Sequence, residues 1–233
     1  MASAPWEFDE SAHAGPEHLD AEYVVGYDRK AGTDPSDDVQ ALRDAGVNQA
    51  GVVVDLGAGT GTFAIAMAPS CREVIAVDVS VPMLDATRER CRRLGVNNVR
   101  CVEAGFLSYR HVGPPADAVY SRNALHHLPD FWKAIALQRI AHLLAPGGVL
   151  RLRDLVYSFE PADAVAVFER WFAGATASSE VGWTRAELEE HVRAEYSPFS
   201  WVLEPMLERC GFEIQAVEYA PTQTYAAYTC RRN

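Results

Sequence analysis

The stretch from Val52 to Phe63, VVVDLGAGTGTF, constrains the fold more than any other part of the chain. It opens with five largely β-branched residues bounded by glycine, which predicts a short strand buried on both faces. Gly57, Gly59 and Gly61 follow, and glycine lets the backbone come close to a ligand. The residues from Phe63 to Ala68 favour a helix whose free N–H groups point at the same turn. Strand, turn and helix N-terminus together predict a cofactor site.

The spacing of the glycines separates two classes of cofactor. A dinucleotide site requires glycine at position 62, where it lets helix and strand pack closely, but residue 62 is threonine. The chain instead has the pattern Asp-x-Gly-x-Gly-x-Gly. This pattern resembles motif I of the class I S-adenosylmethionine-dependent methyltransferases. The resemblance assigns to the cofactor site Asp55, Gly57, Ala58, Gly59 and Gly61.

Composition limits the partners of the chain. Its 233 residues are 48% hydrophobic, which suits a single domain over residues 1–233. The formal net charge is −11, and the only lysines are Lys30 and Lys133. Because phosphate backbones are bound by clustered Lys and Arg, we expect no nucleic-acid partner, and a small or cationic substrate suits the chain better.

The cysteine and histidine pattern indicates compartment and metal use. Five cysteines with no Cys-x-x-Cys pair indicate reduced thiols and a cytoplasmic protein. The start of the chain lacks the charged and apolar segments of a signal peptide, and no apolar run is long enough for a membrane span. The only adjacent pair of histidine or cysteine residues is His126-His127. Because neighbouring side chains point in different directions, we expect no metal site. The lack of a long apolar run leads us to expect no membrane partner.

Strand and helix signals alternate up to residue 155. Strands are predicted at 52–56, 73–78, 99–102, 116–121 and 149–155, with helices between them. Two helical stretches follow, at 160–175 and 184–210, and then two strands at 212–219 and 224–231. The last two strands have only a tight connection between them, so they must be antiparallel. We expect an α/β fold with a doubly wound, mostly parallel, seven-stranded Rossmann-like sheet, an antiparallel last strand, and a helical cap at 156–204 inserted after the fifth strand.

The resemblance to class I methyltransferases extends beyond motif I and covers most of the chain. An acid follows the second strand at Asp78, where the family binds the ribose hydroxyls, and a carboxylate can accept hydrogen bonds from both. Met83, five residues later, stands where the family packs a side chain on adenine, although it also fits the core stripe of its helix. The segment after the fourth strand and the Pro146-Gly147-Gly148 turn match as well. The resemblance adds Val79 and Phe106 to the cofactor set, and Arg122 and Asn123 are expected to line the cofactor or a substrate carboxylate.

One position departs from the family. Gly105 stands where these enzymes usually carry an acid that accepts a hydrogen bond from the adenine amino group. Glu103 lies on the same strand face about 7 Å away, which is too far to replace that acid directly. Gly105 and Phe106 remain in the predicted site, because Phe106 can still offer its backbone N–H and its ring to the adenine.

Catalytic candidates are expected at the carboxyl ends of strands four and five, where ligands of open α/β sheets bind. His127 is a candidate general base, although a histidine here also serves by bonding to backbone. Asp154 could bind a substrate ammonium or hydroxyl group, or be an exposed strand-end acid. The predicted cap is rich in aromatic residues, which suits a small organic acceptor, and Tyr196 is its first candidate. Residues 1–33 are expected to form a mobile lid that carries Tyr23 and Tyr27.

These features predict a methyltransferase that uses S-adenosyl-L-methionine, releases S-adenosyl-L-homocysteine and modifies a small molecule in biosynthetic metabolism. Methyl transfer from a sulfonium needs mainly positioning of the acceptor and removal of a proton, so no fixed catalytic triad is expected. One alternative is a protein of this fold that catalyses a non-methyl reaction, such as an intramolecular displacement or cyclisation, with the cofactor as a bound ligand. Another is a non-catalytic subunit that activates a partner.

Overall fold

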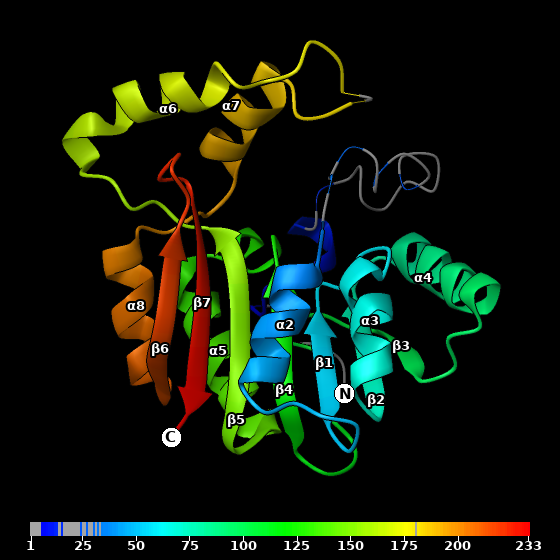
Figure 1. The fold of residues 1–233 in the computed structure, drawn as a ribbon. Helices are drawn as coiled ribbons and strands as arrows, with labels where there is room; N and C mark the ends of the chain where they lie inside the picture. The colour runs from blue at the N-terminus through cyan, green and yellow to red at the C-terminus, as the bar shows by residue number, and fades with distance from the viewer. Residues whose placement is uncertain are drawn as a thin grey trace.

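Seven strands form one sheet through the middle of the molecule in the computed structural model, which describes residues 6–13, 15, 24, 27, 30, 32, 34–179 and 181–233 (Figure 1). The strands are β1 (Val52–Leu56), β2 (Glu73–Asp78), β3 (Val99–Glu103), β4 (Ala116–Arg122), β5 (Leu144–Leu155), β6 (Phe212–Tyr219) and β7 (Tyr225–Arg232). Their order across the sheet is β3-β2-β1-β4-β5-β7-β6. All five residues of β1 are buried, as the valine-rich sequence predicts.

The pairing confirms the predicted fold class. Strands β1 to β5 pair in parallel, whereas β7 is antiparallel to both β5 and β6. Val53 of β1 lies between Val74 of β2 and Ala118 of β4. The chain therefore leaves β1 toward β2 on one side and later returns to β4 on the other side. A crevice opens at the carboxyl ends of the strands where the order reverses in this way.

Helices cover both faces of the sheet (Figure 1). Helices α2 (Ser36–Asp44), α3 (Thr62–Met67) and α4 (Val81–Leu94) lie on one face, with the short turn η3 (Ala68–Ser70) after α3. Helices α5 (Asp130–Leu143) and α8 (Ser200–Arg209) lie on the other face. Helix α4 has a defined start and end, since Ser80 Oγ accepts a hydrogen bond from the N–H of Met83 and Gly95 closes the helix with a φ of +69°.

The cap stands above the carboxyl ends of the strands (Figure 1). It contains η5 (Pro161–Asp163), α6 (Ala164–Phe172) and α7 (Arg185–Ala194), and α7 starts with a capping box of Thr184 and Glu187. Helix α8, in contrast, contacts β6 and α5. The predicted cap boundary at residue 204 therefore falls inside a helix of the sheet layer, and we use the name cap for residues 156–199.

The described part of the N-terminal segment packs against the domain. The side chain of Phe8 lies 6.2 Å from Trp132 of α5, measured between ring centroids, and Trp6 stacks on the same ring at 6.1 Å. A short turn, η1 (Ser11–His13), follows. Of the two tyrosines expected in the lid, Tyr27 lines the cleft at the carboxyl ends of the strands, and Tyr23 falls outside the described residues.

The state of the cysteines and the lengths of the helices bear on two expectations drawn from composition. All five cysteines are free thiols, and Cys71, Cys91 and Cys230 are buried. No helix in the described part of the chain has both the length and the apolar character needed to cross a membrane.

Helix α5 offers a matched pair of positions that tests the packing on its face of the sheet. Leu137 is fully buried against the sheet, whereas Phe131, in the first turn of the same helix, is 64% exposed. We expect Leu137→Ala to lower the free energy of unfolding by about 2–5 kcal/mol, because it removes transfer energy and leaves a cavity. Phe131→Ala should cost under about 1 kcal/mol. Urea denaturation of both variants measures the difference, and equal losses would contradict this packing.

Candidate functional site

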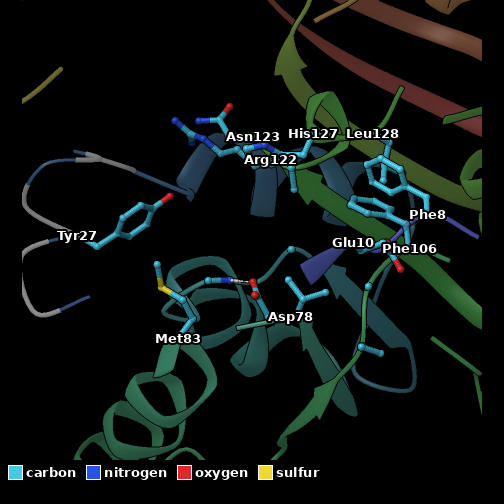
Figure 2. Close-up of a pocket in the computed structure, with 16 residues that line it drawn as sticks. Phe8, Glu10, Tyr27, Asp78, Met83, Phe106, Arg122, Asn123, His127 and Leu128 are labelled. Atoms are coloured by element: carbon cyan, nitrogen blue, oxygen red, sulfur yellow. Dashed lines mark hydrogen bonds between the residues drawn. The ribbon is translucent and has the colours of Figure 1, made fainter. Parts of the chain in front are cut away.

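A cleft opens at the carboxyl ends of β1, β2 and β4, at the point where the strand order reverses (Figure 2). We call it the main cleft. Together with the solvent-open space at its mouth it measures about 700 Å³, and it adjoins a second space, the inner hollow, beside the glycine turn. Eleven of the twelve predicted cofactor residues line one or both spaces: Asp55, Gly57, Ala58, Gly59, Asp78, Val79, Met83, Gly105, Phe106, Arg122 and Asn123.

The glycines of the turn after β1 serve different purposes. Gly59 has a φ of +53°, and an added Cβ there would meet only a ring carbon of Tyr27, at 3.9 Å. Gly61, the twelfth predicted residue, lines neither space. Its φ is +76°, and a Cβ would lie 2.5 Å from the methyl group of Thr87 in α4. Gly59 therefore keeps the cleft open, and Gly61 lets the turn pack against α4.

Asp78 joins the two walls of the main cleft. Its Oδ2 accepts a hydrogen bond from the N–H of Gly59 at 2.8 Å, and its Oδ1 accepts one from the N–H of Ser80 at 2.8 Å. A carboxylate oxygen can accept more than one hydrogen bond, so both oxygens keep capacity for a ligand. The side chain thus orients the glycine turn and presents acceptor oxygens to the cleft (Figure 2).

The inner hollow contains buried polar atoms that lack partners among the described residues. Asp55 is 1% exposed and its Oδ2 accepts no hydrogen bond. Burial, together with the nearby charge of Asp78, raises the pKa of Asp55 well above its usual value, although the N–H of Ala64 opposes this. Arg122 Nε and Nη1 are buried and donate no hydrogen bond. A carboxyl group and a guanidinium facing one hollow fit the ammonium and carboxylate groups of an amino acid.

A closed ion cluster lies behind Arg122. Asp38 of α2 is fully buried, and its Oδ1 accepts a hydrogen bond from Arg151 Nε at 2.8 Å. The hydroxyl of Tyr120 donates to Oδ2 at 3.0 Å. Arg153 Nε lies 3.6 Å and Arg122 Nη1 4.0 Å from the same carboxylate. Three arginine side chains thus surround one carboxylate. Because their positive charge exceeds its negative charge, Arg122 can also pair with a second anion.

A second large cavity, the cap cavity, lies between the cap and the sheet. Its walls include Trp171, Trp183 and Tyr225, with Leu188 and several acidic and histidine side chains. Three residues line this cavity and the main cleft together: Tyr27, Asn123 and His127. The two spaces therefore meet at these side chains. Asn123 has a φ of +49°, a left-handed conformation that is uncommon in non-glycine residues, that asparagine adopts more readily than most, and that is often found at functional sites.

His126 joins the sheet to the cap through two carboxylates. Its Nδ1 lies 2.5 Å from Asp154 Oδ1 of β5, and its Nε2 lies 2.9 Å from Glu195 Oε2, just after α7. Glu195 also forms an ion pair with His191. Burial alone would lower the pKa of His126, but Asp154 and Glu195 raise it to about 9. His126 is therefore a buried cation at neutral pH.

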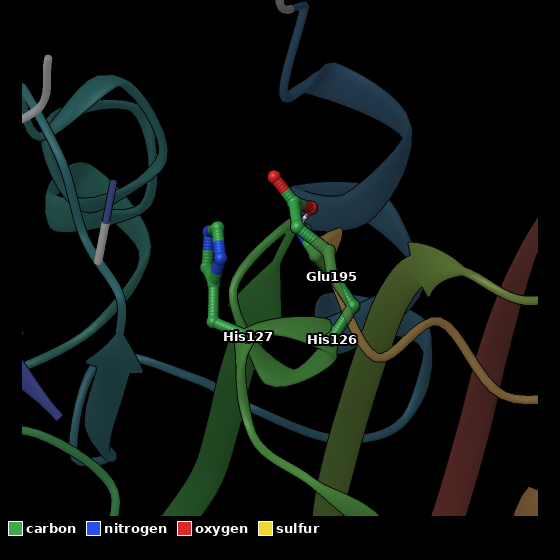
Figure 3. Close-up of side chains that lie close together, drawn as sticks. All are labelled: His126, His127 and Glu195. Atoms are coloured by element: carbon green, nitrogen blue, oxygen red, sulfur yellow. Dashed lines mark ion pairs between the residues drawn. The ribbon is translucent and has the colours of Figure 1, made fainter. Parts of the chain in front are cut away.

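His126 and His127 lie closer together than the sequence suggests. Their rings are 4.2 Å apart between centroids, so the expectation that neighbouring side chains point apart is wrong for this pair (Figure 3). The reason is local, because both residues belong to the tight turn η4 (Leu125–His127). Together with Glu195 they offer potential ligand atoms within 4.8 Å of one another. Both ring nitrogens of His126 are nevertheless engaged by carboxylates, and an imidazolium has no lone pair for a metal.

Two predicted catalytic residues do not reach a cavity. Asp154 is buried rather than exposed, and its oxygens accept hydrogen bonds from the backbone of Leu125, His126 and Leu155 as well as from the His126 ring. It positions η4 and has no access to a substrate. Tyr196 is 41% exposed and lines none of the cavities described above. Its backbone N–H donates to the carbonyl of His126, and its carbonyl accepts from Lys133, so this residue docks the cap.

The site also contains residues that the sequence did not predict, among them Glu195, Tyr225 and Glu10. Glu195, adjacent to Tyr196, is the acid that contacts His126. Tyr225, at the start of β7, closes the cap cavity. Glu10, near the N-terminus, lines the main cleft. The sequence carries no local signal for any of them, because each reaches the site through long-range packing.

Comparison with known proteins gives a consistent family. Residues 53–148 match the family model described as a methyltransferase domain. An uncharacterised methyltransferase of Anoxybacillus flavithermus is 26% identical over 192 residues, covering 82% of this chain and 83% of that protein. One of Mycobacterium tuberculosis is 30% identical over 154 residues, covering 61% of this chain and 76% of its own length. The crystal structure of the [4+2]-cyclase SpnF has a similar fold, with a TM-score of 0.63 at 17% identity over 84% of this chain and 80% of that one.

The buried His126 makes stability depend on pH. Its pKa in the folded chain, about 9, lies above the ordinary histidine value of about 6.5, so its contribution is complete below pH 6.5 and is lost as the pH rises through 9. Glu195→Gln removes one of its carboxylates and should make the melting temperature fall less between pH 6.5 and 9.5 than in the wild type. The control is Glu190→Gln, which removes a nearby acid whose exposed ion pair is with Arg193 instead of His126. Parallel melting curves for Glu195→Gln and the wild type would contradict this assignment.

Proposed function

Because this chain belongs to the class I S-adenosylmethionine-dependent methyltransferases, we propose that it transfers a methyl group to a small organic acceptor held in the cap cavity. The observation that carries the proposal is that Asn123 and His127 line both the main cleft and the cap cavity. A cofactor in the cleft and an acceptor in the cavity would meet at these two side chains. Holding the two reactants together in this way accounts for most of what such a reaction needs from a protein.

The main cleft and the inner hollow suit S-adenosylmethionine group by group. Asp78 would accept hydrogen bonds from the ribose hydroxyls, and Arg122 would pair with the carboxylate of the amino-acid portion. Asp55 Oδ2 would accept a hydrogen bond from the ammonium group. Met83 and Phe106 offer apolar surface for the base. When bound, the cofactor supplies a methyl group on a sulfonium leaving group, so the chain's own residues only orient the partners and move a proton.

The lining of the cap cavity favours an acceptor with an apolar or aromatic body. Trp171, Trp183 and Tyr225 supply flat apolar surface, which binds small organic molecules and excludes water. The three acids of the cavity are paired within the chain: Glu187 with Lys30 at 2.5 Å, Glu190 with Arg193, and Glu195 with His126. Paired acids offer little free charge, so we propose an acceptor that enters neutral rather than the cationic one considered from composition. A cavity of this kind suits a biosynthetic intermediate better than a polymer.

His127 is the proposed general base. It stands where the two spaces meet, whereas its neighbour His126 is already protonated and fully engaged. A base at this point could take the proton of an acceptor hydroxyl as the methyl group is transferred. We propose that the reaction takes place in the cytoplasm, where the five free cysteines would stay reduced.

A non-methyl reaction on the same fold is the second candidate. The similarity to the [4+2]-cyclase SpnF, at 17% identity, is a likeness of fold alone. The two functions differ in one measurable respect. A methyltransferase converts S-adenosylmethionine stoichiometrically with the acceptor, whereas a cyclase leaves the bound cofactor unchanged.

Calorimetric binding tests the cofactor assignment. We expect wild-type protein to bind S-adenosylmethionine and S-adenosylhomocysteine, and Asp78→Asn to bind both about 10- to 100-fold more weakly, because an amide offers one acceptor fewer and no charge. The matched control is Asp85→Asn in α4, whose exposed carboxylate pairs only with Arg88. Failure of the wild type to bind either compound would overturn the proposed function.

A substitution at His127 tests the proposed base. Small phenols, aromatic alcohols and amines, screened with methyl-labelled S-adenosylmethionine, would first identify an acceptor by label transfer. With that acceptor we expect His127→Gln to lower kcat about 10²- to 10⁴-fold while the KM for the cofactor changes little. His142→Gln, an exposed position on α5, is the control. An unchanged kcat in His127→Gln would rule out base catalysis by this residue.

A further inference from the structure

The carboxylate of Glu10 occupies the place of the acid that is missing at position 105. A Cβ added to Gly105 would lie 2.5 Å from Cδ and 2.6 Å from Oε2 of Glu10, and would contact Oε1 as well. A side chain on residue 105 and the present position of Glu10 therefore exclude each other. The carboxyl group sits where an acidic side chain from the end of β3 would begin, although it comes from the other end of the sequence.

The two oxygens of Glu10 are used differently. Oε2 accepts hydrogen bonds from the N–H of Leu107 at 2.9 Å and from the N–H and hydroxyl of Ser108, both at 3.2 Å. Oε1 is buried and has no hydrogen-bond partner among the described residues. Glu10 lines the main cleft, and Figure 2 shows it next to Phe106. One oxygen thus anchors the side chain to the loop after β3, and the other is left for a ligand.

The segment around Glu10 is built to hold this position. Phe8 packs on Trp132 and on His13, the latter at 4.2 Å between ring centroids. Asp9 Oδ1 accepts hydrogen bonds from the N–H and hydroxyl of Ser11, which closes the turn on the other side of Glu10. The aromatic contacts and the turn fix the backbone on both sides of the residue, so its side chain is directed inward.

We propose that Glu10 replaces the missing acid and accepts, at Oε1, a hydrogen bond from the exocyclic amino group of the cofactor's adenine. This inference rests on the proposed function, since it assumes that an adenosine cofactor occupies the main cleft. A carboxylate only accepts hydrogen bonds, and the amino group of adenine donates them. A carbonyl oxygen at the same ring position, as in hypoxanthine, would instead repel it. Residues 6–13 are accordingly part of the cofactor site, and Glu10 determines which base the site takes.

Exchanging the two positions tests the assignment. Glu10→Ala should weaken calorimetric binding of S-adenosylhomocysteine about 10- to 100-fold, because a hydrogen bond to a charged group is lost. Gly105→Asp alone should also weaken binding, since the new side chain collides with Glu10. The double variant Glu10→Ala/Gly105→Asp removes the collision and returns an acid to the site. Its affinity should lie within about 10-fold of the wild type, because the two changes compensate each other.

Base selectivity provides a readout that a purely structural role would not move. We expect the wild type to prefer S-adenosylhomocysteine over its inosine analogue, and Glu10→Gln to reduce this preference at least about 10-fold, because an amide can donate to the carbonyl oxygen. Glu103→Gln, an exposed acid at the end of β3, is the matched control and should keep the wild-type preference. Circular dichroism would verify that all variants are folded.

The outcomes separate this inference from the proposed function. If the wild type binds S-adenosylhomocysteine but the Glu10 variants keep its affinity and base preference, the role of Glu10 is overturned and the function stands. Free-energy losses of the two single variants that simply add in the double variant would also overturn it. A wild type that binds neither cofactor form would instead remove the proposed function, and this inference with it.

Discussion

The hydrogen bond from the N–H of Gly59 to Asp78 is the contact on which the site depends. It joins the turn after β1 to the end of β2, and two further bonds from the N–H groups of Gly57 and Ala58 to the carbonyl of Val77 support it. A turn that follows a buried parallel strand has lost its ladder partners, so its N–H groups must be satisfied elsewhere. They are satisfied by the neighbouring strand end, which shapes the floor of the main cleft before any ligand arrives.

The cleft and the turn that faces the cap come from different parts of the chain. The first half of the chain supplies the cleft from β1, β2 and the loop after β3, while β4 and β5 position the η4 turn that faces the cap. The cap is attached mainly by polar contacts: His126 to Glu195, the carbonyl of His126 to the N–H of Tyr196, and Lys133 to the carbonyl of Tyr196. Such contacts are directional and leave the apolar cavity beneath the cap open. These contacts can therefore fix the position of the cap while the cap cavity stays open for an acceptor.

Local patterns allowed the sheet and most of the cleft to be predicted from the sequence. Asp55, the glycines and Asp78 lie within one strand-turn-helix unit and its neighbour, where spacing alone places a residue at a strand end. The surroundings of the catalytic candidates Asp154 and Tyr196 could not be predicted, because their burial and partners depend on contacts between β5, η4 and the cap. Glu10 could not be found, since it lies 97 residues from Leu107 in the chain and reaches it only through the packing of the N-terminal segment. The acid missing at Gly105 was a visible signal, but the sequence did not indicate what would fill its place.

The buried charges of this protein fall into two groups, and the difference locates the site on physical grounds. In the first group each charge is matched inside the chain, as in Asp38 with Arg151 and Asp154 with His126. Such pairs hold elements together, because separating them would leave an uncompensated charge in a medium of low dielectric constant. In the second group a buried polar atom lacks a hydrogen-bond partner among the described residues, and six residues carry such an atom: Glu10, Asp55, Ser121, Arg122, Asn123 and Glu195. Four of the six, Glu10, Asp55, Arg122 and Asn123, line the main cleft or the inner hollow. Leaving such atoms unpaired costs stability, and the cost is recovered when a ligand of complementary polarity binds. The pattern of acceptor and donor atoms in this second group therefore describes the ligand: an amino-acid portion at Asp55 and Arg122, and a hydrogen-bond donor at Glu10.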